Sequence, residues 1–128
     1  IFVRLAIDGQ PIRIFGDGSQ LRDFNYIDDV VDACLLVTGR QDLGRHVYNL
    51  GSTEHVSLLD FVQLLHEHCE FEHEVVPFPA DHQAIDIGDY YADFSLIQQE
   101  TGWRPKTSLR EGLARTIEYF RPRASSYW

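Results

Sequence analysis

The sequence predicts an α/β fold, and two observations carry that prediction. Short apolar segments rich in β-branched and aromatic residues alternate with segments whose apolar residues recur at helical spacing, and this alternation is typical of α/β proteins. The 128 residues are 44% hydrophobic and include nine glycines and five prolines, which is the composition of an ordinary folded domain. The predicted strands are too few for a complete doubly wound sheet, so we expect a fragment of a longer polypeptide.

The N-terminal part predicts a helix, a strand and a bend. Residues 1–9 place apolar side chains at helical spacing with no cap or starting Met before them, so we expect the chain to begin inside a helix that ends at a glycine. Residues 11–15 (PIRIF) predict a strand with Ile12 and Ile14 on one face. Residues 16–19 (GDGS) predict a turn.

The middle of the chain repeats the pattern of strand and helix. Residues 23–27 (DFNYI) are rich in aromatic and β-branched side chains and predict a strand. Asp28 or Asp29 can then cap a helix over residues 30–38. Residues 47–51 (VYNLG) predict a second buried strand.

Two capping boxes mark the later helices. Ser57 with Asp60, and Ser108 with Glu111, have the spacing at which each pair closes the first turn of a helix. The expected elements are a helix from 58 to about 69, a strand over 74–78, a short helix that Asp93 caps and Gly102 ends, and a helix from 109 to 120. We expect a single domain over residues 1–121 and a loose tail over 122–128.

Charge and cysteine content restrict the partners. The formal net charge of −9 disfavours nucleic acid and anionic lipid surfaces. The sequence contains no apolar run near the roughly 20 residues that span a bilayer. Cys34 and Cys69 fall on the apolar faces of predicted helices, which predicts buried thiols, a reducing compartment and a cytoplasmic location.

The sequence shows no catalytic set, cofactor motif or metal site. His66 and His68 would project about 160° apart on a regular helix, so they do not share one ion. Asp86 and Asp89 fit a loop that caps itself better than an acid and base pair. The sequence contains no nucleophile with an evident base, and no glycine-rich phosphate or dinucleotide loop.

A polar cluster follows the glycine bend and suggests a binding site. Gly16 and Gly18 suit either a plain turn or a close approach of backbone amides to a ligand. Arg22 carries a planar fork of donors matched to phosphate or carboxylate. The alternative for Arg22 is a structural ion pair with one of the acids nearby in sequence, Asp17, Asp23 or Asp29.

Asn49 follows an apolar segment where a small polar side chain gains nothing from packing. It either hydrogen-bonds the local backbone in a turn or projects over the C-terminal edge of the sheet, where α/β proteins bind ligands. The sequence leaves both roles open.

Three motifs in this order resemble the C-terminal portion of extended short-chain dehydrogenase/reductases. They are PIRIFGDGSQLRDFNYIDDVVDACLL (11–36), VYNLGS (47–52) and DYYADFSLIQQETGWRPKTSLREGLARTIEYF (89–120). The resemblance covers about residues 1–121. That family contains NAD-dependent nucleotide-sugar epimerases, dehydratases and decarboxylases.

The resemblance implies the substrate-binding part of a Rossmann-like enzyme, without its dinucleotide-binding half. In the parent, that half would bind NAD and carry a Tyr-x-x-x-Lys pair, and NAD would remove and return a hydride. A homodimeric enzyme similar to UDP-glucose 4-epimerase is expected, with a nucleotide-diphosphate sugar as ligand. The residues implied in substrate binding are Arg13 and Phe15 through the backbone of their strand, Gln20, Arg22 at the diphosphate, and Asn49.

One position departs from the family pattern. Many epimerases carry an Arg-x-Gly-Asp segment whose arginine contacts phosphate, and the matching stretch here begins with Asp86. A carboxylate in that place would repel a diphosphate. This departure supports an alternative hypothesis, a non-catalytic binding or scaffold module that keeps the fold without the chemistry.

Overall fold

The computed structural model describes residues 1–44, 47–80 and 86–128. Contacts group the chain into two compact units, where the sequence predicts a single domain over 1–121. The first unit comprises Ile1–Arg22, Val56–Tyr90 and Leu113–Trp128, and the second comprises Asp23–His55 and Tyr91–Gly112.

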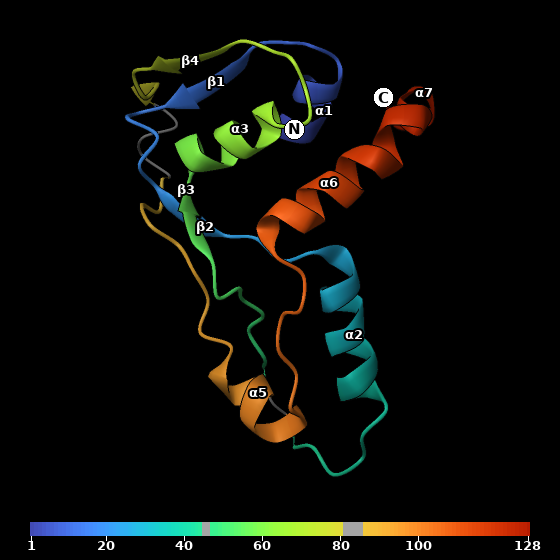
Figure 1. Cartoon of the computed structure of the whole chain (residues 1–128). Helices are drawn as coiled ribbons and strands as arrows, with labels where there is room; N and C mark the ends of the chain where they lie inside the picture. Colours follow the sequence, from blue (N-terminus) through green and yellow to red (C-terminus); the bar gives the residue numbers. More distant parts are fainter. Residues whose placement is uncertain (45–46, 81–85) are drawn as a thin grey trace. The chain divides into compact units, whose positions relative to one another are not determined.

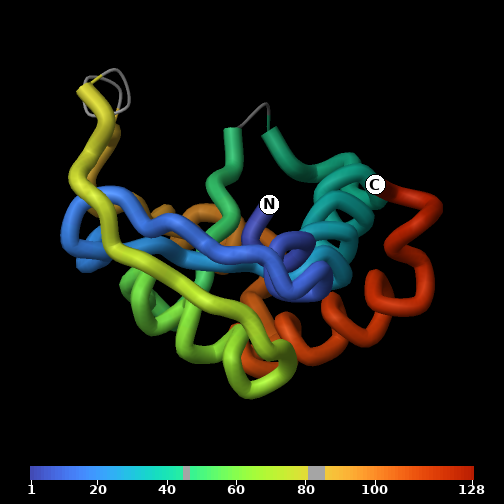
Figure 2. Tube along the Cα trace, turned by 90° about the horizontal axis from the view of Figure 1, so that it is seen from above, coloured from blue at the N-terminus to red at the C-terminus, as the bar shows by residue number. Residues whose placement is uncertain are grey.

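A parallel strand pair forms the centre of the first unit. β1 (Ile12–Phe15) pairs with β4 (His73–Val76), with Ile12 opposite His73, and Figure 2 shows their blue and yellow traces side by side. Ile12 and Ile14 are fully buried, as the alternation of the predicted strand requires. The other buried apolar residues of this unit are Ala6, Phe61, Val62, Leu65, Cys69, Leu113 and Ile117.

Two helices of the first unit confirm sequence predictions. α1 (Phe2–Ile7) is followed by Gly9 in a left-handed conformation. α3 (Leu58–His66) begins with the predicted capping box, in which the Ser57 hydroxyl accepts a hydrogen bond from the Asp60 amide at 3.0 Å. The helix ends at His66, about three residues before the predicted end.

The second unit is built on two helices and a tryptophan. α2 (Ile27–Thr38) and α5 (Ser95–Thr101) contribute Ala33 and Ile97 to a core that includes Trp103 (Figure 1). The Trp103 indole donates to the Asp29 carbonyl at 2.9 Å. Gly102 ends α5 in a left-handed conformation, as predicted.

The first half of the chain differs from its predicted elements at three places. The strand comes earlier than expected, because β2 (Leu21–Asp23) pairs with β3 (His55–Ser57) and residues 24–26 are irregular. α2 consequently starts at Ile27, and its N-cap residue makes no side-chain cap. Residues 47–51 form no strand, since the described part of the chain offers no neighbouring strand to pair with them.

Asp29 is not the predicted helix cap. Asp29 is only 3% exposed, and its Oδ2 accepts hydrogen bonds from the amides of Lys106 and Thr107 at 3.1 and 2.9 Å. Because α2 begins before Asp29, this carboxylate is free to anchor the segment that follows Trp103.

The C-terminal residues, for which the sequence predicts a loose tail over 122–128, form short helical turns. α6 (Leu109–Phe120) is followed by η1 (Arg121–Arg123) and α7 (Ala124–Tyr127). The Trp128 indole donates to Asp8 at 3.1 Å, and Arg121 donates to the His68 carbonyl at 2.6 Å. These bonds join the C-terminal segment to other parts of the first unit, and the looseness of residues 122–128 stays a prediction.

The two cysteines differ in exposure. Cys69 is buried as predicted, but Cys34 is exposed, as are the apolar residues Val31 and Leu35 of the same helix. Within the described residues, no helix is long and apolar enough to cross a membrane.

Candidate functional site

The glycine bend is closely packed, which explains its sequence. Gly16 and Gly18 both have positive φ angles, 78° and 72°. A Cβ atom at Gly18 would lie 2.7 Å from Leu59 Cγ, and one at Gly16 would lie 2.7 Å from a ring carbon of Phe78. Both positions therefore require glycine for conformation and for space.

Asp17 belongs to the bend itself. Its Oδ1 accepts hydrogen bonds from the Ser19 hydroxyl at 2.6 Å and the Ser19 amide at 2.9 Å. These two bonds, the hydroxyl bond first, lower the pKa of Asp17 below its ordinary value. Asp17 is therefore held by the turn and does not pair with Arg22, as one of the alternatives expected.

The outer edge of β1 carries backbone groups outside the strand ladder. The amides of Ile12 and Gly16 donate to carbonyls on the β4 side, each at 2.9 Å. In a parallel pair, alternate residues face alternate edges, so the backbone groups of Arg13 and Phe15 face the other edge. The Arg13 side chain pairs with Glu74 at 2.7 Å.

Gln20 lies against that same edge. Its Nε2 donates to the Phe15 carbonyl at 3.1 Å, so two of the predicted site residues are in contact. Its Oε1 is buried and has no hydrogen-bond partner in the described part of the chain. The Phe15 ring lies beside Phe78, with ring centroids 6.0 Å apart.

Arg22 is half-buried and contacts a segment far along the chain. Its Nη1 donates to the carbonyls of Leu21 and Gly88 at 2.7 and 2.5 Å. Its Nη2 lies 3.8 Å from Asp86 Oδ1. The acid beside the guanidinium is thus Asp86 and not Asp17, Asp23 or Asp29, because only the folded chain brings residues so far apart together.

Two hydrogen bonds attach residues 86–90 to Leu21 of β2, and a third lies within the segment. The Tyr90 amide donates to the Leu21 carbonyl at 3.0 Å, and Asp89 accepts from the Leu21 amide at 2.8 Å. Asp86 Oδ2 accepts from the Gly88 amide at 3.3 Å. The acids of this loop therefore organise the loop, as the sequence predicts, and also set the surroundings of Arg22.

Asn49 lies in the second unit and is exposed. In the same unit, Asp23 Oδ2 accepts hydrogen bonds from the amides of Ser52 and Ala92 at 3.3 and 3.0 Å. Asp23 is thereby used in holding two chain segments together. The grouping of Asn49 with the other four site residues stays a prediction.

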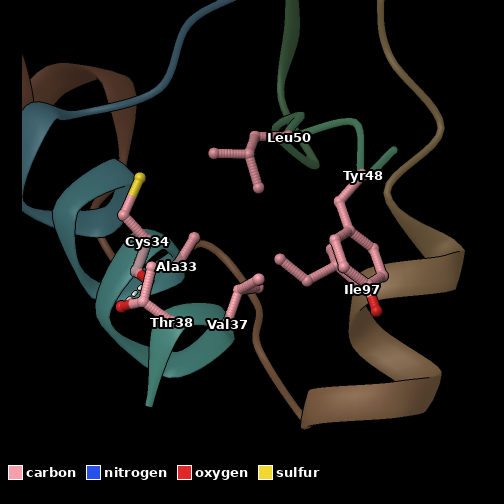
Figure 3. A pocket seen from close by; sticks show the side chains of 7 residues that line it. All are labelled: Ala33, Cys34, Val37, Thr38, Tyr48, Leu50 and Ile97. Carbon is pink, nitrogen blue, oxygen red and sulfur yellow. Dashed lines mark hydrogen bonds between the residues drawn. The ribbon is translucent and has the colours of Figure 1, made fainter. Parts of the chain in front are cut away.

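The second unit also has an apolar pocket. Its volume is about 260 Å³, and Figure 3 shows side chains of α2 and α5 around it. The lining residues are Ala33, Cys34, Val37, Thr38, Tyr48, Leu50 and Ile97. The Thr38 hydroxyl donates a hydrogen bond to the Cys34 carbonyl at 2.8 Å, and the Tyr48 hydroxyl donates one to the Glu100 carboxylate. An apolar pocket without a cation does not suit a diphosphate.

Histidine and cysteine side chains form no metal cluster in the described residues, where no three potential ligands gather. His66 lies 3.1 Å from His73, measured between Nε2 and Nδ1, and it stacks on Phe71. The neighbour of His66 is therefore a histidine on β4 and not His68.

Comparison with known proteins identifies relatives of the chain. A family model described as the NAD dependent epimerase/dehydratase family matches residues 1–51. The dTDP-glucose 4,6-dehydratase of Haemophilus influenzae is 31% identical, over 98% of this chain and 40% of that protein. The UDP-glucuronate 4-epimerase of Thermodesulfobacterium geofontis is 32% identical, over 92% of this chain and 36% of that protein.

A solved structure agrees with these relatives. MoeE5 in complex with UDP-glucuronic acid and NAD matches with a TM-score of 0.82 and 33% identity, over 94% of this chain and 40% of that one. The chain thus spans 36% to 40% of the length of these three proteins. Since the family model, the relatives and the fold agree, the chain belongs to the NAD-dependent epimerase/dehydratase family and corresponds to part of the extended short-chain dehydrogenase/reductase fold.

Proposed function

We propose that this chain binds the nucleotide diphosphate of a nucleotide-sugar in an NAD-dependent epimerase or dehydratase similar to UDP-glucose 4-epimerase. Bound NAD would supply the chemistry of hydride removal and return. The sequence contains no glycine-rich strand-to-helix turn, so we assign NAD binding and catalysis to other parts of such an enzyme. The relatives' names support the ligand class, since they include a dTDP-glucose dehydratase and a UDP-glucuronate epimerase.

The placement of Arg22 carries the proposal. Its Nη1 makes both hydrogen bonds that the described residues provide to this guanidinium. The Nε and Nη2 donors then remain for a ligand, and they are the pair that can bind two oxygens of one phosphate. The side chain is 23% exposed, so a ligand can reach it while the surroundings still weaken the competition from water.

The outer edge of β1 suits the nucleotide base. The Arg13 amide and carbonyl face away from β4, and the edge they occupy has no strand beside it among the described residues. A pyrimidine presents a donor next to acceptors, which matches a backbone carbonyl and amide. In this arrangement Phe15 and Gln20 line the same ligand, and the role of Asn49 stays a prediction.

Calorimetric titration of the intact protein with UDP-glucose and dTDP-glucose tests the proposal. Arg22→Ala should weaken binding by on the order of 2 kcal/mol, because it removes charge-assisted hydrogen bonds to phosphate. Arg104→Ala is the matched control, since Arg104 is exposed and its loss changes the net charge equally. Equal affinity of wild type and Arg22→Ala would refute the phosphate role.

A second candidate is a non-catalytic binding or scaffold module. The observation that favours it is the carboxylate of Asp86 beside the guanidinium, which opposes an anionic ligand. The sequence of the adjoining polypeptide decides between the two. A parent without a glycine-rich dinucleotide turn and without a Tyr-x-x-x-Lys pair would favour the scaffold.

A further inference from the structure

We propose that Asp86 competes with the ligand's diphosphate for Arg22 and thereby sets the affinity of the site. This inference rests on the proposed function of Arg22. The carboxylate lies 3.8 Å from the guanidinium, on the side of the Nη2 atom that makes no hydrogen bond with the described residues. A phosphate that binds this donor must therefore either displace Asp86 or bind next to its negative charge, which repels it.

Asp86 is held in this position by the fold. Its Oδ2 accepts a hydrogen bond from the Gly88 amide at 3.3 Å, and the Gly88 carbonyl in turn accepts from Arg22 Nη1 at 2.5 Å. The same segment is attached to β2 through the bridge between Arg22 and Tyr90. The fold consequently places the carboxylate near the guanidinium before a ligand arrives.

The Asp86–Arg22 pair is weak enough to be separated. The distance of 3.8 Å is too long for a hydrogen bond, and both side chains are about a quarter exposed, 23% for Arg22 and 27% for Asp86. Ion pairs of this kind contribute little to folding stability. A phosphate can bring two oxygens to the same fork, so it displaces the carboxylate at a cost in affinity.

The experiment is a double-mutant cycle on nucleotide affinity. Asp86→Asn keeps the side-chain oxygen that accepts from Gly88 and removes only the charge. In the intact protein we expect it to tighten UDP-glucose binding roughly tenfold, the scale of one partly exposed charge interaction. In the Arg22→Ala background the same substitution should change affinity less than about twofold, because the guanidinium for which Asp86 and the phosphate compete is absent.

The controls separate this inference from the proposed function. Glu72→Gln removes an equal charge from an exposed residue immediately before β4 and should leave affinity unchanged. Unchanged or weaker binding by Asp86→Asn would overturn the inference, and so would a tenfold gain that persists without Arg22. Failure of Arg22→Ala alone to weaken binding would instead overturn the phosphate role itself.

Discussion

Asp29 shows how much one buried carboxylate can hold together. It accepts two amide hydrogen bonds through Oδ2, and its own carbonyl accepts from the Trp103 indole. We expect Asp29→Ala to lower the free energy of unfolding by about 3 kcal/mol, since two backbone amides lose their partner in a buried place. Asp29→Asn retains one oxygen and should cost less. Urea unfolding measures both.

Asp32 provides the control for this prediction. Its carboxylate pairs with the Lys106 ammonium at 2.8 Å, and both side chains are well exposed. Asp32→Ala should therefore change the free energy of unfolding by less than about 1 kcal/mol. Equal losses for the two alanine variants would show that burial and amide bonding do not distinguish Asp29.

The glycine bend is the element on which the candidate site depends. Gly18→Ala combines an unfavourable left-handed backbone with a Cβ only 2.7 Å from Leu59 Cγ and 3.0 Å from Ile14 Cγ2. We expect a loss of about 3 kcal/mol in the free energy of unfolding, measured by urea titration.

Gly102→Ala separates the two contributions. Gly102 has a similar φ of 76°, but a Cβ there would meet nothing within 4 Å. Its substitution should cost only the backbone strain, about 1 kcal/mol. A cost at Gly102 as large as that at Gly18 would contradict a role for packing in the bend.

Local chemistry explains which elements the sequence predicts correctly. The strand around Ile12 and Ile14, the capping box of Ser57 and Asp60, and the end of α5 at Gly102 all depend on residues within a few positions of one another. The strand expected over 47–51 depends on a partner strand, and no signal within the segment supplies one.

The candidate site follows the same division. The bend and Gln20 on Phe15 lie within a few residues of each other. Arg22 and Asp86 are 64 positions apart in the sequence. The packing of residues 86–90 on β2 brings them together. A signal existed in the departure from Arg-x-Gly-Asp at Asp86, but it gave no position relative to Arg22.

At the scale of the whole molecule, the grouping into two units could not be predicted either. Each unit collects segments from separate parts of the chain, so its extent depends on long-range contacts. α6 contributes residues to both units. A continuous helix of this kind couples the unfolding of the parts that share it.

The two tryptophans give each unit its own natural fluorophore. Trp103 is 2% exposed in the second unit, whereas Trp128 belongs to the first unit and lies under the Arg4 guanidinium. In Trp128→Phe the remaining emission reports only the second unit, while circular dichroism reports the whole chain. We expect the two melting curves to coincide because of the shared helix. Separate midpoints would show that the two units unfold independently. Tryptophan fluorescence would then follow the unfolding of the second unit without an added dye.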